Sequence, residues 1–210
     1  MACEVSFSGY VWSQQSPDTE SYLWKSLQLL LNELAVEKAQ VFDFGNRALV
    51  ALLARLGYRT IGVQPRSRAI QLARQQSSHL KFHQASADPA ELASLALPAF
   101  DVVLSTEVVE YVYLPHRGAA AAHSVLKPGG VLICSTPYHG YLKNCALACS
   151  GKLDAPFTAP WDGGYIKFWN RRTLTALLQE TGFHVMAFRG VGWLRWLWKS
   201  MILVARKPTL

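Results

Sequence analysis

The chain has 210 residues, of which 50% are hydrophobic and 17% are charged, a composition that favours one folded domain and excludes disorder over most of its length. No apolar run reaches the ~18 residues that a membrane-spanning helix needs, and the first ten residues lack the basic and apolar regions of a signal peptide, so we expect neither. The formal net charge of +7 suits an anionic partner, but most basic residues are scattered and no recognised nucleic-acid-binding module accompanies them, so no nucleic acid is expected.

The cysteines indicate in which cellular compartment the protein works. The chain has Cys3, Cys134, Cys145 and Cys149 without a CxxC pair, which favours a reducing cytoplasm. A peripheral contact with a membrane surface is a separate expectation. Cys145 and Cys149 are four residues apart, a spacing that metal ligands use on helices, but no histidine or further cysteine completes a ligand set. We therefore expect these cysteines to be buried or idle free thiols, and we expect no bound metal.

Segments with the periodicity of helices alternate along the chain with segments typical of strands. The expected helices cover residues 20–35, 47–57, 67–76, 91–95, 117–126 and 170–182, and the expected strands cover 39–44, 58–64, 79–86, 100–106, 131–137, 183–190 and 200–207. This alternation predicts an α/β fold with a doubly wound, mainly parallel seven-stranded sheet whose last two strands pair antiparallel at an edge. We expect a single domain over 1–210, with an N-terminal helical segment (1–38) and an irregular insertion (138–170) on the substrate side.

Ligands of such sheets bind beyond the carboxyl ends of the strands. That rule selects the segments 43–47, 64–66, 86–89 and 105–111. In the first of these, the strand runs into Asp43 and then into Gly45, and a helix begins almost at once. A strand, an acid, a glycine and a helix in this order are typical of nucleotide-cofactor sites, although such sites normally carry more glycines.

Three stretches are more specific. They are STEVVEYV (105–112), LKPGGVLICSTPYHGYLKN (126–144) and WDGGYIKFWNRRTLTALLQETGF (161–183). With them, residues 21–206 resemble class I S-adenosylmethionine-dependent methyltransferases, and most of all the ubiquinone-type O-methyltransferase branch. The resemblance implies a Rossmann-like methyltransferase fold, S-adenosylmethionine as cofactor, and methyl transfer to a hydroxyl of a small hydrophobic or aromatic acceptor.

The resemblance assigns the first cofactor-binding motif to Asp43, Phe44, Gly45, Asn46 and Arg47. The family has an acid followed by a turn of the form G-x-G-x-G, whereas this turn is about two residues short and has Arg47 where another glycine falls. Glycines there let the backbone approach the methionine part of the cofactor. Arg47 either pairs with the carboxylate of the cofactor or fills the site, and the sequence is compatible with both.

Further cofactor positions follow the next strands. Gln64 stands where the family has an acid that binds the ribose hydroxyls, so it can form the hydrogen bonds without charge assistance, at a cost of roughly tenfold in affinity. Asp88 lies near the family's adenine-binding acid, although Asp before Pro is also an ordinary turn starter. Thr106 and Glu107 follow the fourth strand, where the family lines its cofactor pocket.

These departures motivate a second hypothesis. A descendant with degenerate motifs can keep the scaffold without methylating, as a binding or partner subunit of another protein or with different chemistry in the pocket. A nucleotide-dependent oxidoreductase is disfavoured, because no G-x-G-x-x-G follows the first strand.

Two residues are candidates for the base that activates the acceptor hydroxyl. His139 follows the fifth strand between two tyrosines, where a structural role is equally compatible. Glu110 is the weaker candidate, since an acid is also common at the start of a helix. The family's usual EHV is Glu110-Tyr111-Val112 here, so a histidine often found at the mouth of the site is missing.

The insertion supplies the expected acceptor pocket, because aromatic and polar side chains over the ends of strands suit a planar, hydrophobic molecule. The candidates are Tyr138, Tyr141, Lys143, Trp161, Tyr165, Lys167 and Trp169. The alternative is that the aromatic residues form a small core of the insertion itself.

The stretch VGWLRWLWKS (191–200) combines aromatic and basic residues, a pattern that favours a membrane interface. The expected contacts of a transient encounter with a membrane surface are Trp193, Arg195, Trp196, Trp198 and Lys199. The stretch is short and connects two strands, so we do not expect stable membrane binding from it alone.

Overall fold

The computed structural model describes residues 19–34, 36, 39–44, 47–65, 67, 70–71, 80–157 and 164–209, with only the backbone of residues 19–21 and of Arg47. Its helices are α1 (Thr19–Glu33), α2 (Arg47–Arg55), α4 (Pro89–Ser94), α5 (Pro115–Val125), α6 (Tyr141–Cys149) and α7 (Arg171–Glu180), with the short 3-10 turns η1 (Val109–Tyr111) and η2 (Ala155–Phe157). Its strands are β1 (Gln40–Phe44), β2 (Arg59–Gln64), β3 (Lys81–Gln84), β4 (Phe100–Thr106), β5 (Leu126–Pro137), β6 (His184–Val191) and β7 (Ser200–Arg206).

The seven strands form one sheet in the order β3-β2-β1-β4-β5-β7-β6. Strands β1 to β5 pair in parallel, and β7 pairs antiparallel with both β5 and β6. The expected α/β fold with an antiparallel pair at one edge is therefore confirmed. Because β1, β2, β4 and β5 run in parallel, their carboxyl ends lie along one edge of the sheet.

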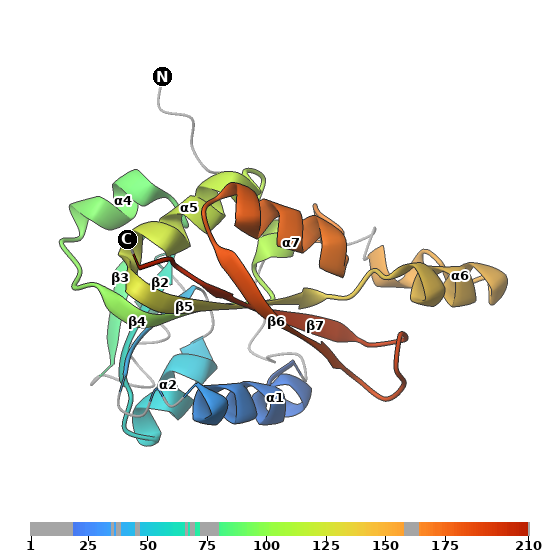
Figure 1. Cartoon of the computed structure of the whole chain (residues 1–210), viewed down its shortest axis with the longest axis horizontal. Helices are drawn as coiled ribbons and strands as arrows, with labels where there is room; N and C mark the ends of the chain where they lie inside the picture. Colours follow the sequence, from blue (N-terminus) through green and yellow to red (C-terminus); the bar gives the residue numbers. More distant parts are fainter. Residues whose placement is uncertain are drawn as a thin grey trace.

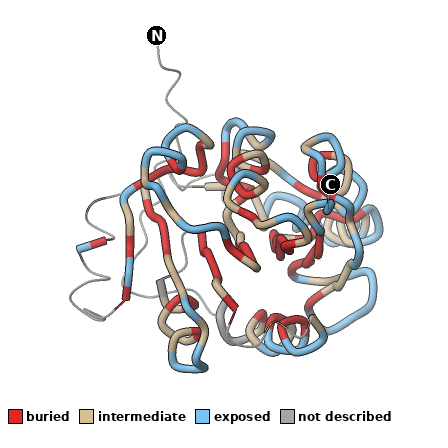
Figure 2. The backbone as a smooth tube through the Cα atoms, turned by 60° about the vertical axis from the view of Figure 1, so that its left-hand side comes forward, coloured by how far each residue is buried: buried red, intermediate tan, exposed pale blue. Residues whose placement is uncertain are grey.

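Helices cover both faces of the sheet (Figure 1). On one face α1 and α2 pack against β-strand side chains such as Val41, Leu104 and Ile133, and on the other face α5 and α7 pack against Phe42, Val103 and their neighbours. The central strands β1 and β4 are mostly apolar and mostly buried, as a parallel sheet between two helical layers requires. Figure 2 shows this arrangement as buried strands inside a shell of exposed helix surfaces and loops.

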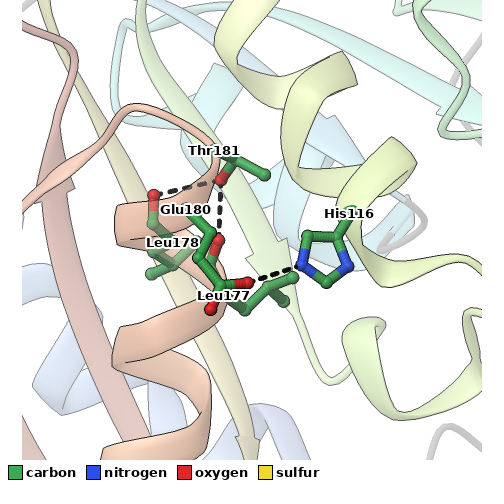
Figure 3. Close-up of polar contacts among 5 residues, drawn as sticks. All are labelled: His116, Leu177, Leu178, Glu180 and Thr181. Carbon is green, nitrogen blue, oxygen red and sulfur yellow. Dashed lines mark hydrogen bonds and ion pairs between the residues drawn. The ribbon is translucent and has the colours of Figure 1, made fainter.

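Local signals explain several of the helix boundaries. Asn170 caps α7, because its Oδ1 accepts from the backbone N–H of Thr173, while the Thr173 hydroxyl accepts from the N–H of Asn170. At the other end of α7, the Thr181 hydroxyl donates to the carbonyl oxygens of Leu177 and Leu178 (Figure 3). The same view shows His116 of α5 hydrogen-bonded to Glu180 of α7, with 2.8 Å between Nε2 and Oε2. These contacts fix the pair of helices that covers the sheet behind β4 and β5.

Two expected elements differ in extent. The strand β5 begins at Leu126, five residues before the expected start, because residues 126–130 already lie beside β4 across a register shift. The insertion is partly helical, since α6 occupies residues that sequence periodicity left irregular. The helix expected over 67–76 lies mostly outside the described residues. Among the residues described, no helix has both the length and the apolar character needed to cross a membrane.

Candidate functional site

The carboxyl ends of β1, β2 and β4 bring three polar side chains to one edge of the sheet. Asp43, Gln64 and Thr106 are all buried there, with 1%, 6% and 2% of their surface exposed. Asp43 pairs in register with Gly62 of β2 on one side and with Leu104 of β4 on the other. The three predicted cofactor-binding residues that end these strands therefore lie on neighbouring strands. Buried polar groups at this edge are typical of a ligand site in this kind of sheet.

The glycine turn itself cannot be placed in the same way. Gly45, Asn46 and the side chain of Arg47 lie outside the described residues, so the role of Arg47 stays a prediction. Phe44, which precedes them, is described. Its ring is buried on the α5 side of the sheet, 5.0 Å from the ring of Phe42.

Glu107, directly after β4, has an unusual backbone. Its φ is 53°, in the left-handed region that non-glycine residues seldom adopt. Such a residue costs about 1–3 kcal/mol and persists only where its surroundings hold it, which happens most often at functional sites. Here the backbone N–H of Glu107 donates to the Ser135 carbonyl oxygen at 3.0 Å, which ties the residue to the end of β5.

The Glu107 carboxylate is the centre of a hydrogen-bond network. Its Oε1 accepts from the hydroxyls of Ser135 at 3.0 Å and of Ser200 at 3.1 Å, and the hydroxyl of Tyr22 lies 3.1 Å from that of Ser200. The network therefore joins β4, β5, β7 and α1 at the edge of the sheet. Burial raises the pKa of Glu107 to about 7, although the two serine hydroxyls and the nearby charges of Lys199 and Lys143 oppose the increase.

Glu110 is a second carboxyl and is fully buried, with 1% of its surface exposed, whereas Glu107 is half-buried. Its Oε2 accepts from the hydroxyl of Thr136 at 3.0 Å, and its Oε1 has no hydrogen-bond partner among the described residues. Burial raises the pKa of Glu110 well above its usual value, and the nearby charge of Glu107 raises it further. Both carboxyls therefore favour the protonated form more strongly than a carboxyl in water does.

A lysine completes the polar surroundings. Lys143, on α6, donates from Nζ to the Tyr138 carbonyl oxygen at 2.8 Å and contributes its charge near Glu107. Burial lowers the pKa of Lys143, and Glu107 partly offsets this. Lys199 lies over the ring of Tyr22, with 4.2 Å between Nζ and the ring centroid. The site therefore combines two carboxyls, two lysines and several hydroxyls.

His139 lies just beyond β5 and is 7% exposed. Its backbone N–H donates to the Trp169 carbonyl oxygen at 2.9 Å, and its ring lies 5.0 Å from that of Phe168. Nε2 is buried without a hydrogen-bond partner in the part of the chain that the structure describes. Burial, reinforced by the charge of Lys143, lowers the pKa of His139 to about 4. The imidazole is therefore neutral at pH 7.

Asp88 has a structural task within its own segment. Its Oδ1 accepts from the backbone N–H of Ala90 and of Glu91 at the start of α4, and its Oδ2 pairs with the Arg117 guanidinium at 2.6 Å. Both carboxylate oxygens are thus engaged within the fold. The predicted contact with adenine stays a prediction, and it requires one of these two interactions to be shared.

We expect Asp88→Ala to lower the free energy of unfolding by about 1–3 kcal/mol, because it removes both a helix cap and a charge-assisted contact. Asp88→Asn is the matched variant, since the amide keeps the cap and loses only the pairing with Arg117. It should cost about half as much. Urea unfolding monitored by circular dichroism measures both, and equal losses for the two variants would contradict the assigned cap.

The insertion divides its candidate residues between the interior and the surface. Tyr138 and Trp169 are buried and form a bridge between their backbones, and Trp169 Nε1 donates to the Val109 carbonyl oxygen at 3.4 Å. Tyr141 is 81% exposed on α6. The backbone N–H of Lys167 donates to the carbonyl oxygen of Glu110 at 3.0 Å, so the residues around Lys167 close over η1. Trp161 lies outside the described residues.

Tyr165 lies within the electrostatic influence of both carboxylates. Its ring is 5.3 Å from that of Tyr111, to which its side chain is hydrogen-bonded. Burial raises the pKa of Tyr165, and the charges of Glu110 and Glu107 raise it further. The acceptor-binding roles of these residues stay predictions, but the structure places Tyr165 beside the predicted chemistry.

Sequence reasoning missed four residues of this site. Tyr22, Ser135, Thr136 and Ser200 surround the two carboxylates, and none was singled out. A signal existed for two of them, because Ser135 and Thr136 are polar residues at the end of an otherwise apolar strand. Tyr22 and Ser200 come from distant parts of the chain, and no local pattern connects them to Glu107.

Part of the site suits a nucleoside cofactor. Thr106 Oγ1 is buried and lacks a hydrogen-bond partner among the described residues, and native proteins normally pair such an atom. A ligand hydroxyl or amino group would supply the partner, and the buried amide of Gln64 can donate and accept in the same way. The residues at the ends of β1, β2 and β4 thus fit a bound nucleoside, whereas Asp88 is held by its own segment.

Comparison with known proteins decides the family. The sequence profile described as a methyltransferase domain matches residues 20–187. The chain belongs to the methyltransferase family.

The fold of the chain is consistent with this family. A putative methyltransferase of Haloferax volcanii, solved in complex with the Trm112 methyltransferase activator, superposes with a TM-score of 0.67 at 20% identity, covering 90% of this chain and 91% of that one. The 1,6-didemethyltoxoflavin-N1-methyltransferase of Burkholderia thailandensis, with bound S-adenosylhomocysteine, superposes with a TM-score of 0.64 at 18% identity, covering 90% and 79%.

Curated relatives place the chain near the ubiquinone-type branch of this family. A ubiquinone biosynthesis O-methyltransferase of Dinoroseobacter shibae is 31% identical over 155 residues, which are 70% of this chain and 60% of that protein. One of Cereibacter sphaeroides is 37% identical over 107 residues, which are 49% of this chain and 43% of that protein. The methyltransferase therefore spans about half of the length of these relatives, and the identity of its acceptor is not carried over from them.

Proposed function

We propose that this methyltransferase transfers the methyl group of S-adenosylmethionine to a hydroxyl of a small hydrophobic or aromatic acceptor. The observation that carries the proposal is the pair of carboxyls beyond the end of β4, the half-buried Glu107 and the buried Glu110. A hydroxyl acceptor must lose a proton during methylation. A carboxylate whose pKa lies near 7 is well matched to take that proton at neutral pH.

Different residues of the chain would bind the cofactor and receive the proton of the acceptor. Asp43, Gln64 and Thr106 would hold the nucleoside part of the cofactor. The sulfonium of the cofactor supplies the electrophilic methyl group. Glu107 and Glu110 would receive the proton of the acceptor hydroxyl. Because the pair is coupled, the proton belongs to both carboxyls, and Thr136 and Ser135 orient the oxygens that receive it. Positioning contributes the rest of the rate enhancement.

His139 is better suited to positioning than to proton transfer. A pKa of about 4 leaves the imidazole uncharged at neutral pH and makes it a weak base. Its aromatic neighbours Phe157 and Phe168 form an apolar rim around the ring. We therefore assign the base to the carboxylate pair, and to His139 a hydrogen bond that orients the acceptor.

The decisive experiment is isothermal titration of the purified chain with S-adenosylmethionine and S-adenosylhomocysteine. We expect binding by both, weakened by the neutral Gln64. Gln64→Asp should tighten it by about tenfold, because hydrogen bonds from ribose hydroxyls to a carboxylate are stronger than those to an amide. Gln84→Asp, the same change at the exposed end of the neighbouring strand β3, should leave the affinity unchanged.

The outcomes separate the two hypotheses. Absence of heat at millimolar ligand overturns the proposal and favours a descendant that no longer methylates. Binding that Gln64→Asp does not alter keeps the proposal but removes Gln64 from the ribose. If binding is present, release of S-adenosylhomocysteine in the presence of simple phenols tests the hydroxyl acceptor.

A further inference from the structure

The loop between β6 and β7 exposes an unusual run of large apolar side chains. Trp193 is 102% exposed, and Leu194, Trp196 and Leu197 are 62%, 48% and 40% exposed. Single exposed apolar residues are ordinary, but four within five consecutive positions, two of them tryptophan, form a contiguous apolar tip. We call residues 192–199 the hairpin tip.

The hairpin tip is held in shape from within. The ring of Trp198 packs 5.4 Å from Phe188 and 5.2 Å from Tyr138, and it lies so close to the backbone of Gly190 that any side chain there would collide with it. The Lys199 N–H donates to the Val191 carbonyl oxygen at 2.9 Å and closes the loop. Trp198 is therefore the internal support of the tip, while Trp193 is fully exposed and Trp196 is half exposed, with its ring 5.5 Å from that of Trp198.

The surroundings of the hairpin tip are positively charged. Residues 181–210 contain no acid and have as their basic residues Arg189, Arg195, Lys199, Arg206 and Lys207. The Arg195 guanidinium lies 5.1 Å from the ring centroid of Trp196, and Glu33 of α1 is paired with Arg189. No acidic side chain of the tip opposes an approach to an anionic surface.

The hairpin tip and α6 project from the same end of the molecule (Figure 1). α6 adds the exposed Tyr141 and Leu142, and Lys143 at its start reaches the Lys199 carbonyl oxygen at 3.5 Å. This end also holds the carboxyl edge of the parallel strands. Ser200, the residue after the tip, donates to Glu107 at 3.1 Å. A surface bound by the tip would therefore lie next to the predicted acceptor site.

We propose that the hairpin tip, with the start of α6, docks the protein on an anionic lipid bilayer. Tryptophan rings settle at the level of lipid headgroups, and basic side chains beside them gain from anionic lipids. A protein partner fits less well, because a stable protein interface buries about 800 Å² on each side, whereas this patch is a narrow tip of one loop and part of one turn of helix. Docking would open the site toward a source of lipophilic acceptors, and it does not depend on the cofactor.

Vesicle flotation of the full chain tests the proposal. We expect binding to vesicles of phosphatidylcholine with about a third of phosphatidylglycerol, and much weaker binding to phosphatidylcholine alone or in 1 M salt. The double variant Trp193→Ser, Trp196→Ser should lower the partition coefficient at least tenfold. Arg195→Gln should lower it about fivefold, the value of one basic residue near such a surface.

Matched controls come from the opposite edge of the sheet. Leu56 is 50% exposed in the turn before β2, and Arg55 beside it is exposed at the end of α2. Leu56→Ser and Arg55→Gln should bind vesicles as the unchanged chain does. Because all the substituted side chains are exposed, circular dichroism should show every variant folded.

Three results would overturn the proposal. The first is no binding of the unchanged chain to phosphatidylglycerol vesicles, and the second is equal binding of the double variant. The third is a dimer in light scattering that the double variant abolishes while vesicle binding persists, which would assign the hairpin tip to a second copy of the chain.

Discussion

Glu110→Gln should lower the rate of methyl transfer by about 100- to 1,000-fold while making the fold more stable above pH 7. The loss of rate is the expected effect of removing one of the two carboxyls that together receive the proton of the acceptor. The amide is nearly isosteric and can still accept from Thr136, so the variant should keep the geometry of the site. Release of S-adenosylhomocysteine with the best phenol acceptor measures the rate.

The gain in stability follows from the direction of the pKa shift. Burial and Glu107 raise the pKa of Glu110 in the folded chain, so the folded state binds more protons than the unfolded state. Stability contributed by the protonated carboxyl is complete below the unfolded pKa, near 4.5, and is lost as the pH rises toward the folded pKa. A glutamine has no such loss. Urea unfolding should show Glu110→Gln more stable by about 1–3 kcal/mol at pH 8, with a smaller difference at pH 5.

Glu180→Gln is the control for both measurements. Glu180 is an exposed acid on α7 that contacts His116, and the amide should keep that contact without changing rate or stability. A Glu110→Gln variant with an unchanged rate would move the base to Glu107 or His139. A variant less stable at pH 8 than at pH 5, relative to the unchanged chain, would contradict the raised pKa.

Phe42→Ala should lower the free energy of unfolding by about 3–5 kcal/mol, the usual loss when a fully buried aromatic ring is removed. Phe42 is 0% exposed at the centre of β1, and its ring lies 5.0 Å from those of Phe44 and Phe100. The three rings fill the space between the sheet and the helices α5 and α7. Loss of the ring leaves a cavity one residue before Asp43, so cofactor affinity should also fall.

Urea unfolding followed by tryptophan fluorescence measures this change. Phe42→Leu, which keeps most of the volume, should cost about 1–2 kcal/mol. Leu29→Ala, at a position 54% exposed on α1, should cost less than about 0.5 kcal/mol. If Phe42→Ala and Leu29→Ala lose similar amounts, the ring of Phe42 does not lie in the core.

Most of the fold could be predicted from local patterns. Apolar runs such as residues 100–106 are typical of strands buried on both faces, and the alternation with helical periodicity predicts a parallel sheet. The long strand β5 was underestimated, because residues 126–130 contain Pro and two Gly, which usually mark a turn. Two sets of contacts outweigh that preference. Residue 126 pairs with β4, and the Gly129 N–H donates to the carbonyl oxygen of Lys207, just after β7.

The site was predicted less completely. Glu107 and Glu110 could be selected because they follow a buried strand at the edge where ligands bind. The influence of each carboxyl on the protonation of the other could not be predicted, because protonation depends on burial and on nearby charges, and these come from several elements. The same holds for His139, whose low pKa arises from burial and Lys143.

The sequence by itself determined the order of the strands along the chain, the family, and the edge of the sheet where a ligand is expected, because these depend on periodicity and on motifs within short segments. Only the tertiary structure decided which groups act together. Ser135 of β5 and Ser200 of β7 donate to Glu107, and Tyr22 of α1 contacts Ser200. Asp88 is occupied by its own helix start and by Arg117. Contacts of this kind join residues far apart in the chain, and they form only when packing of the apolar faces brings the elements together.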